Sequence, residues 1–168
     1  MRHFPILLFI LLFTSTSLLA QNPQVTLFFS TTCPICEAHT KTIREFSEKW
    51  EEKVDVRLIF IKYDSRKDAR AYKRKYELTQ RSKVDRKAKW QARYGPTHTP
   101  EVFLEDGEGK VVYQGRINNL YESLGVRRGV VTERYLDDAV TALLEGKPIP
   151  VAKTPPIGCL LEKVRRAD

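Results

Sequence analysis

Cysteine is scarce in this sequence. Its 168 residues include only Cys33, Cys36 and Cys159. A small exported domain held together by disulfides would use more cysteines, evenly paired. The scarcity therefore excludes a disulfide-stapled scaffold. One close pair and one distant cysteine indicate thiols that react rather than thiols that brace the fold.

Long apolar runs are also missing. The longest unbroken run, residues 4–13, is shorter than the ~20 residues that a membrane span needs. Arg2 and His3 precede it and Ala20 ends the small, polar stretch after it, which is typical of a secretory signal peptide. We expect cleavage after Ala20 and a secreted or periplasmic protein with no membrane span in the mature chain. A retained N-terminal anchor is the alternative.

Internal repeats and nucleic-acid motifs are absent, although the chain is basic. Residues 62–93 contain 13 Lys or Arg and four Asp or Glu, a net charge of +9, against +8 for the whole chain. A solvated helix face explains such a segment most simply. It could also bind an acidic partner. Because no recognised motif accompanies the charge, we expect no nucleic-acid partner.

The most informative stretch is Cys33-Pro34-Ile35-Cys36. An apolar run at residues 25–29 predicts a buried strand before it, and helical spacing of apolar residues over 35–50 predicts a helix after it. Pro34 suits the first turn of that helix. A cysteine at a helix start has a lowered pKa, because backbone N–H groups and the helix dipole favour its thiolate. We interpret the pair as a redox centre in which Cys33 attacks.

The remaining pattern predicts an α/β domain. The continuous apolar residues 58–61 favour a central strand in a parallel arrangement. We expect a signal peptide at 1–20, one domain at 21–146 and an irregular C-terminal tail at 147–168. The expected elements are strands at 24–30 and 54–63, helices at 66–76 (capped by Asp64-Ser65) and 85–94 (capped by Asp85), a connector or short edge strand at 77–84, a hairpin of 101–105 with 110–114, and a helix from 132 to 146.

This order of elements, with Thr99-Pro100 directly before the hairpin, resembles the thioredoxin-like superfamily and, within it, the exported redoxins of the AhpC/TSA and TlpA-like group. The resemblance implies a central mixed sheet with helices on both faces and a helical insert before a cis-proline loop. It implies that the Pro100 peptide bond is cis and lies against the Cys33 sulfur. The catalytic residues implied are Cys33, Cys36, Thr99 and Pro100, with no cofactor and no metal.

Three positions depart from patterns in that superfamily. Leu27 stands where thioredoxin has a buried carboxylate, which leaves open how Cys36 loses its proton. Thr32 replaces an aromatic residue before the first cysteine. Ser30 lies three residues before Cys33, so the Thr-x-x-Cys motif of peroxidases is absent and reduction of hydroperoxides is disfavoured.

These features predict an exported thiol–disulfide oxidoreductase that exchanges disulfides with protein thiols or disulfides. Cys33 would form a mixed disulfide with the partner and Cys36 would resolve it. The uncharged Pro34 and Ile35 between the sulfurs mildly favour a reductant. A permanent Cys33–Cys36 staple is disfavoured, because closing so short a loop constrains the unfolded chain little. A non-catalytic binding module that uses segment 62–93 is a further alternative.

A second alternative is a copper or zinc site. Cys33, Cys36 and His39 could supply soft ligands, with Cys159 or His98 completing the set. Residues 33 and 39 point in different directions on a helix, which weakens this interpretation. His98 is otherwise a loop residue near the centre or a catalytic base. Cys159 could be a third redox thiol, a link to another chain or a buried bystander.

Overall fold

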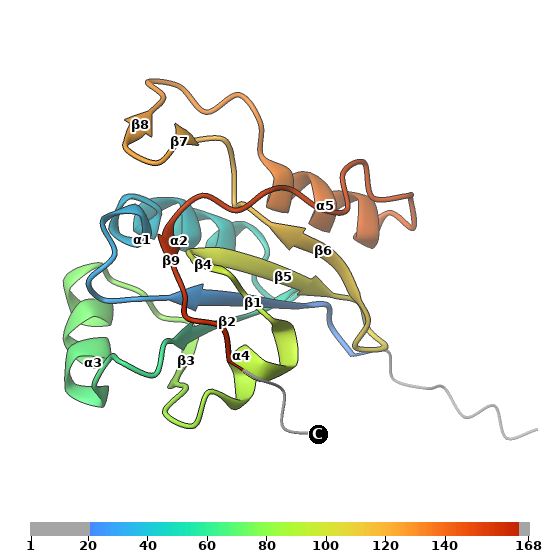
Figure 1. Cartoon of the computed structure of the whole chain (residues 1–168). Helices are drawn as coiled ribbons and strands as arrows, with labels where there is room; N and C mark the ends of the chain where they lie inside the picture. The colour runs from blue at the N-terminus through green and yellow to red at the C-terminus, as the bar shows by residue number, and fades with distance from the viewer. Residues whose placement is uncertain (1–20, 165–168) are drawn as a thin grey trace, which may run out of the picture.

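A computed structural model describes residues 21–164 (Figure 1). The predicted signal peptide, residues 1–20, lies outside the described residues. Within residues 21–164, no helix combines the length and the apolar character needed to cross a membrane.

The centre of the fold is a five-stranded mixed sheet with the order β3-β2-β1-β5-β6 (Figure 1). β1 (Gln24–Phe29), β2 (Asp55–Phe60) and β3 (Arg81–Val84) run parallel to one another. β5 (Glu101–Glu105) pairs antiparallel with β1 and with β6 (Val111–Gly115). The predicted mixed sheet and the predicted hairpin are therefore confirmed.

Helices cover both faces of this sheet, as predicted. Most of them pack on one face: α1 (Pro34–Ala38), α2 (Thr40–Lys49), α3 (Arg66–Lys75) and α5 (Tyr135–Leu144). The other face carries α4 (Lys89–Tyr94). The segment from α3 to α4 is the predicted insert before the cis-proline loop. The second face is small and mostly aromatic, built from Phe28, Ile59, Phe103, Trp90 and Tyr94.

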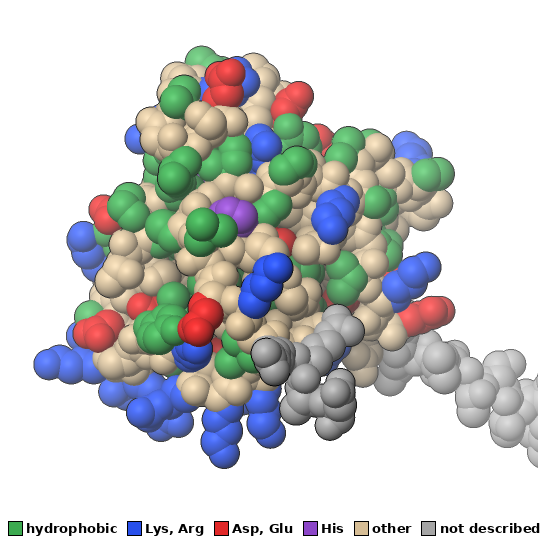
Figure 2. Space-filling model, in the orientation of Figure 1, with side chains coloured by type: hydrophobic (Ala, Val, Ile, Leu, Met, Phe, Trp, Pro, Cys, Tyr) green, Lys and Arg blue, Asp and Glu red, His purple; other side chains and the backbone are tan. Residues whose placement is uncertain are grey.

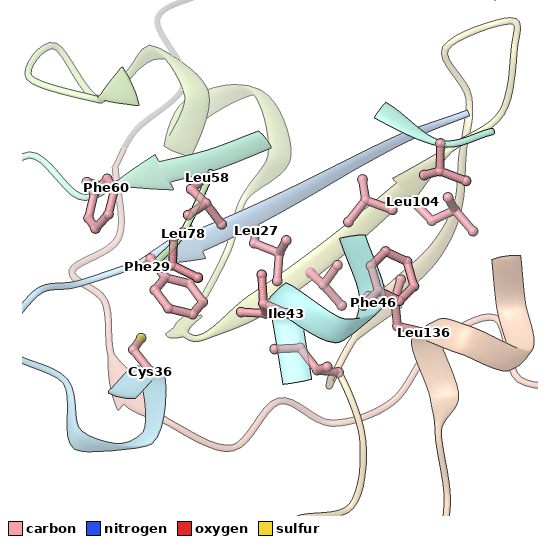
Figure 3. Packing of buried hydrophobic residues seen from close by; sticks show 14 of the residues in the cluster. Leu27, Phe29, Cys36, Ile43, Phe46, Leu58, Phe60, Leu78, Leu104 and Leu136 are labelled. Carbon is pink, nitrogen blue, oxygen red and sulfur yellow. The ribbon is translucent and has the colours of Figure 1, made fainter. Parts of the chain in front are cut away.

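Alternation along β1 builds the main core. Leu27 and Phe29 are fully buried in the main core; Ile43 of α2 lies beside Leu27, and Leu136 of α5 lies beside Phe46 (Figure 3). Burying one such side chain stabilises the fold by about 1.5–3 kcal/mol. Leu27, which stands where thioredoxin has its carboxylate, is thus part of the apolar core.

The helix after Cys33 is interrupted, so the prediction of one helix over 35–50 is wrong. His39 is both the C-cap of α1 and the N-cap of α2, with φ −95° and ψ −3°. Its ring Nδ1 donates to the Ile35 carbonyl at 2.8 Å, and Thr40 Oγ1 donates to the Glu37 carbonyl at 2.8 Å. These bonds occur at the end of α1, where the His39 N–H donates to the Cys36 carbonyl at 3.1 Å.

The segment left open at 77–84 contains β3, an edge strand. The next helix starts later than predicted, because α4 begins at Lys89 and Ala88 occupies its N-cap position. Asp85 accepts a hydrogen bond from the Gln91 N–H at 2.8 Å. Asp85 therefore supports the first turn of α4 through its side chain but is not the N-cap residue of that helix.

Two further pairs of short strands lie outside the central sheet. β7 (Tyr121–Ser123) and β8 (Val126–Arg127) form a small hairpin before α5. Residues 147–164 are otherwise irregular, but they return across the molecule from α5 and form β9 (Cys159–Leu160) (Figure 1). β9 pairs antiparallel with β4 (His98–Thr99).

Candidate active site

The turn before Cys33 is held by a carboxylate from another element. Thr31 donates its backbone N–H to Asp64 Oδ1 at 3.1 Å and its hydroxyl to the same oxygen at 2.5 Å. Of the predicted capping pair, Ser65 is the cap, since its Oγ accepts from the Asp68 N–H at 3.0 Å. Asp64 instead joins the loop after β2 to the loop after β1, which fixes the position of Cys33.

Cys33 and Cys36 lie at the start of α1, and both are reduced. Their side chains are almost completely buried, with 2% and 0% exposed. The Cys36 thiol donates to the Cys33 sulfur, and this bond is the main reason why the pKa of Cys33 falls from 9.0 to about 4. Burial raises the pKa of Cys36, and the neighbouring Cys33 raises it further. The pair therefore separates into one thiolate and one thiol.

The predicted cis peptide bond is present between Thr99 and Pro100. The Thr99 carbonyl lies 3.1 Å from the Cys33 sulfur and accepts from it when Cys33 is protonated. Thr99 and Pro100 are both buried. The four predicted site residues thus meet at one place, where the start of α1 faces the loop before β5.

A buried carboxylate that the sequence did not single out holds this loop. Glu101 is 1% exposed. Its Oε2 accepts from the N–H groups of Thr97 at 2.7 Å and His98 at 3.2 Å, and its Oε1 accepts from Gln114 Nε2 at 2.9 Å. The signal in the sequence is an acidic residue directly after Thr-Pro at the start of a buried strand. Glu101 fixes the backbone that faces Cys33.

Cys159 is the third member of the site. Its sulfur lies 2.7 Å from the Cys33 sulfur and donates to it. Cys159 is the most exposed of the three cysteines, although still half-buried. Burial, together with the bond to Cys33, raises the pKa of Cys159 to about 12. The Cys33 thiolate therefore accepts hydrogen bonds from two thiols, Cys36 on α1 and Cys159 on β9.

The histidines of the alternative metal set have other partners. His39 is buried, and its Nε2 lies 3.2 Å from Asn118 Oδ1 while Nδ1 donates to Ile35. Burial lowers the pKa of His39. His98 Nδ1 lies 2.9 Å from the Thr97 hydroxyl. Within residues 21–164, no group of three or more His, Cys, Asp or Glu side chains is arranged to hold a metal ion.

The basic segment 62–93 lies along one edge of the molecule (Figure 2). Lys and Arg side chains gather along the lower edge in Figure 2, over the region that α3, β3 and α4 occupy in Figure 1. Arg81 and Lys83 are exposed on β3, the edge strand of the sheet. The positive charge thus forms a surface of the insert.

Comparisons with known proteins agree with this fold. The model of the AhpC/TSA family matches residues 13–114. No curated protein matches the chain. An uncharacterized conserved protein from Geobacillus kaustophilus has 22% identity and a TM-score of 0.75, over 84% of this chain and 77% of that one. A thioredoxin-like protein in its oxidized form has 16% identity and a TM-score of 0.60, over 77% and 82%.

A third solved structure is a secreted Mycobacterium tuberculosis disulfide oxidoreductase, described as homologous to E. coli DsbE. It has 20% identity and a TM-score of 0.50, over 54% of this chain and 66% of that one. At these identities, the solved structures establish that the fold is thioredoxin-like.

Proposed function

Because the chain belongs to the AhpC/TSA family, we propose that it is a thiol–disulfide oxidoreductase that exchanges disulfides with partner proteins through Cys33 and Cys36. The observation that carries this proposal is the Cys33 sulfur, a thiolate at neutral pH that faces both the Cys36 thiol and the Thr99 carbonyl. A thiolate is the form of cysteine that attacks disulfides.

The exchange has two steps. The Cys33 thiolate attacks one sulfur of a partner disulfide, so that a Cys33–partner bond forms and the other partner sulfur leaves as a thiolate. Cys36 then attacks the Cys33 sulfur, the Cys33–Cys36 bond forms, and the leaving partner sulfur takes up the proton that Cys36 gives up. The partner disulfide gains two electrons and the protein loses two. The same steps in reverse oxidise a partner dithiol.

The direction follows from the Cys33 thiolate. A dithiol whose reduced form is stabilised is a stronger oxidant, because oxidation destroys the favourable thiolate. The low pKa of Cys33 stabilises the reduced protein and supports oxidation of partner thiols. The stabilised thiolate outweighs the mild preference for a reductant that the uncharged Pro34 and Ile35 suggest. Equilibration with glutathione buffers would measure it.

We also propose that the protein works outside the cytoplasm. The signal-peptide pattern of residues 1–20 supports export, as does the fold shared with a secreted disulfide oxidoreductase. Only in an oxidising compartment would an exchanged disulfide persist. N-terminal sequencing of the protein recovered from its native host should begin at Gln21, and a start at Met1 would contradict cleavage.

An acidic partner protein for the segment 62–93 is a related proposal, supported by the net charge and exposure of that segment. Attraction between exposed charges is screened by salt. The rate of exchange with an acidic protein substrate should therefore fall as the salt concentration rises. A neutral small disulfide is the control, and an equal fall for both substrates would contradict the proposal.

A trapping experiment tests the function directly. Replacing Cys36 and Cys159 by serine leaves Cys33 alone, so a mixed disulfide with a partner cannot be resolved within the chain. We expect this variant, expressed in the native host, to accumulate covalent adducts that a reductant releases. The matched control also carries Cys33→Ser. Equal adducts in both variants, or none in either, would contradict the proposal.

A further inference from the structure

The segment after Pro156 lies on the active site as an added strand. Thr99 and Cys159 are partners in the antiparallel pair of β4 with β9, and the Leu161 N–H donates to the Thr97 carbonyl at 2.8 Å. β4 is the backbone that immediately precedes the cis Pro100 and contacts the Cys33 sulfur. The chain's own C-terminal segment therefore occupies the strand edge beside its nucleophile.

Contacts on the far side of Cys159 fix this segment. Glu162 accepts from Lys62 Nζ at 2.9 Å and from the Tyr63 hydroxyl, while its backbone carbonyl accepts from Gln91 Nε2 at 2.5 Å. Lys62 and Gln91 belong to the segment between β2 and β4. The end of the segment is therefore held by hydrogen bonds that do not involve the three cysteines.

Contacts on the near side centre on Thr154, which is buried. The Thr154 hydroxyl accepts from the Arg116 N–H at 2.8 Å and lies 2.9 Å from the Tyr113 hydroxyl. Arg116 Nε donates to the Pro155 carbonyl at 2.6 Å. Gly115 permits this approach, because a Cβ there would lie 2.2 Å from the Thr154 hydroxyl oxygen. The segment is thus held at both ends, with Cys159 between them.

Gly158 makes the close approach to the loop possible. A Cβ on this residue would lie 2.1 Å from the Thr99 carbonyl oxygen, the same oxygen that faces Cys33. Any larger residue would push the strand away from β4. The absence of a side chain at Gly158 therefore allows the Cys159 sulfur to lie beside Cys33.

From this geometry we propose that Cys159 is an internal substrate of the site, and that a Cys33–Cys159 disulfide is a redox state of the protein. The proposal rests on the exchange chemistry proposed above. In the oxidised protein, the Cys159 thiolate attacks the Cys33 sulfur of the Cys33–Cys36 disulfide. The Cys33–Cys159 bond forms, the Cys33–Cys36 bond breaks, and Cys36 leaves as a thiolate that takes up the proton lost by Cys159. No net oxidation occurs, and the step is reversible.

The docked strand has a consequence for partners. Cys33 is buried beneath it, and the edge of β4 is already paired. A partner disulfide therefore reaches Cys33 only after β9 leaves β4. The internal thiol thus competes with external ones at an effective concentration of millimolar order, which is usual for a tethered group.

Disulfide mapping tests the proposal. Cys36→Ser protein, incubated with oxidised glutathione, should form an intrachain Cys33–Cys159 disulfide and release two reduced glutathione molecules per chain. Cys33 attacks the glutathione disulfide first, and Cys159 then displaces the bound glutathione. Peptide mass mapping identifies the product. A chain that stays glutathionylated at Cys33, with Cys159 free, would overturn the proposal.

A second variant tests whether docking is the cause. Gly158→Ala in the Cys36→Ser chain should slow closure of the Cys33–Cys159 disulfide and speed alkylation of Cys33 by iodoacetamide, each on the order of tenfold, the effect of about 1.4 kcal/mol. Gly129→Ala is the control, since a Cβ there meets nothing within 4 Å. Unchanged rates in the Gly158 variant would overturn the docking argument.

The outcomes separate this proposal from the function. If the Cys33–Cys159 disulfide never forms while the wild-type protein exchanges with protein disulfides, the internal substrate is refuted and the function stands. If the disulfide forms but no partner protein exchanges, the function is refuted and the internal substrate stands.

Discussion

The sulfurs of Cys33 and Cys159 lie 2.7 Å apart although 126 residues separate them in the chain. They meet because β9 pairs with β4, whose Thr99 carbonyl also contacts Cys33. A third thiol at this distance changes the chemistry of a Cys-x-x-Cys pair. It supplies a second hydrogen bond to the thiolate and a second intrachain partner for a disulfide.

Cys33 should ionise with a pKa of about 4, so the ultraviolet absorbance of its thiolate should rise as the pH rises through that value. Cys36→Ala and Cys159→Ala each remove a thiol donor and should raise the pKa of Cys33, the first by more. Cys159→Ser keeps a donor and is the matched control. A pKa near the ordinary 9.0 in the wild-type protein would contradict the assigned bonds.

The same group affects stability. The unfolded chain binds a proton at this thiol between about pH 4 and 9, and the folded reduced chain does not. Cys33 therefore contributes stability that is fully present above pH 9 and lost as the pH falls toward 4. Urea unfolding under reducing conditions should show that stability rises less between about pH 4 and 9 in Cys33→Ala than in the wild-type protein. Identical pH dependence in both proteins would contradict the prediction.

The two intrachain disulfides should stabilise the fold unequally. A Cys33–Cys159 bond closes a loop of 126 residues, for which the chain-entropy model gives about 4–5 kcal/mol. The Cys33–Cys36 bond closes a very short loop and should contribute much less. Urea unfolding of oxidised and reduced Cys36→Ser protein measures the stabilisation by the Cys33–Cys159 bond. The same comparison in Cys159→Ser measures the stabilisation by the Cys33–Cys36 bond. Equal gains in the two variants would contradict the prediction.

Thr154 should matter through its hydroxyl rather than its shape. Thr154→Val leaves the part-buried Arg116 N–H without its acceptor, so we expect a loss of about 1 kcal/mol in the free energy of unfolding. Thr154→Ser keeps the hydroxyl and should lose less. Denaturant unfolding of both variants decides this. A serine variant as unstable as the valine variant would assign the effect to packing.

Glu101 should position the loop that carries Thr99. Glu101→Gln replaces a charge-assisted acceptor of two backbone N–H groups by a neutral amide, which should cost about 1–3 kcal/mol of stability. It should also change the alkylation rate of Cys33, because the Thr99 carbonyl would shift. Glu108→Gln, at an exposed turn, is the control. A Glu101 variant that matches this control in both measurements would contradict the assigned role.

Much of the fold could be predicted from local patterns. The apolar run before Cys33, the Gly-rich turn after residue 105 and the stripe of the last helix each report on neighbours within a few residues. Thr99-Pro100 added a long-range relation, because its resemblance to a known loop placed it beside Cys33. The mixed sheet and the cis bond follow from these features.

The rest depends on contacts between segments that are distant in sequence. The break at His39 coincides with hydrogen bonds of two side chains to α1 carbonyls, which periodicity does not register. Glu101 is buried because backbone N–H groups of the preceding turn face it. The position of Cys159 depends on Thr154 and Gly158, whose partners lie on β6 and β4. No periodic pattern in residues 147–164 indicated that β9 pairs with β4.

The central claim is that Cys33 is the attacking thiolate. The most direct measurement is the rate at which the protein, with dithiothreitol as reductant, reduces the disulfides of a model protein such as insulin. Wild-type and Cys159→Ser proteins should accelerate the reaction, and Cys33→Ser should fall to the rate of the reductant alone. Full activity in Cys33→Ser would contradict the account.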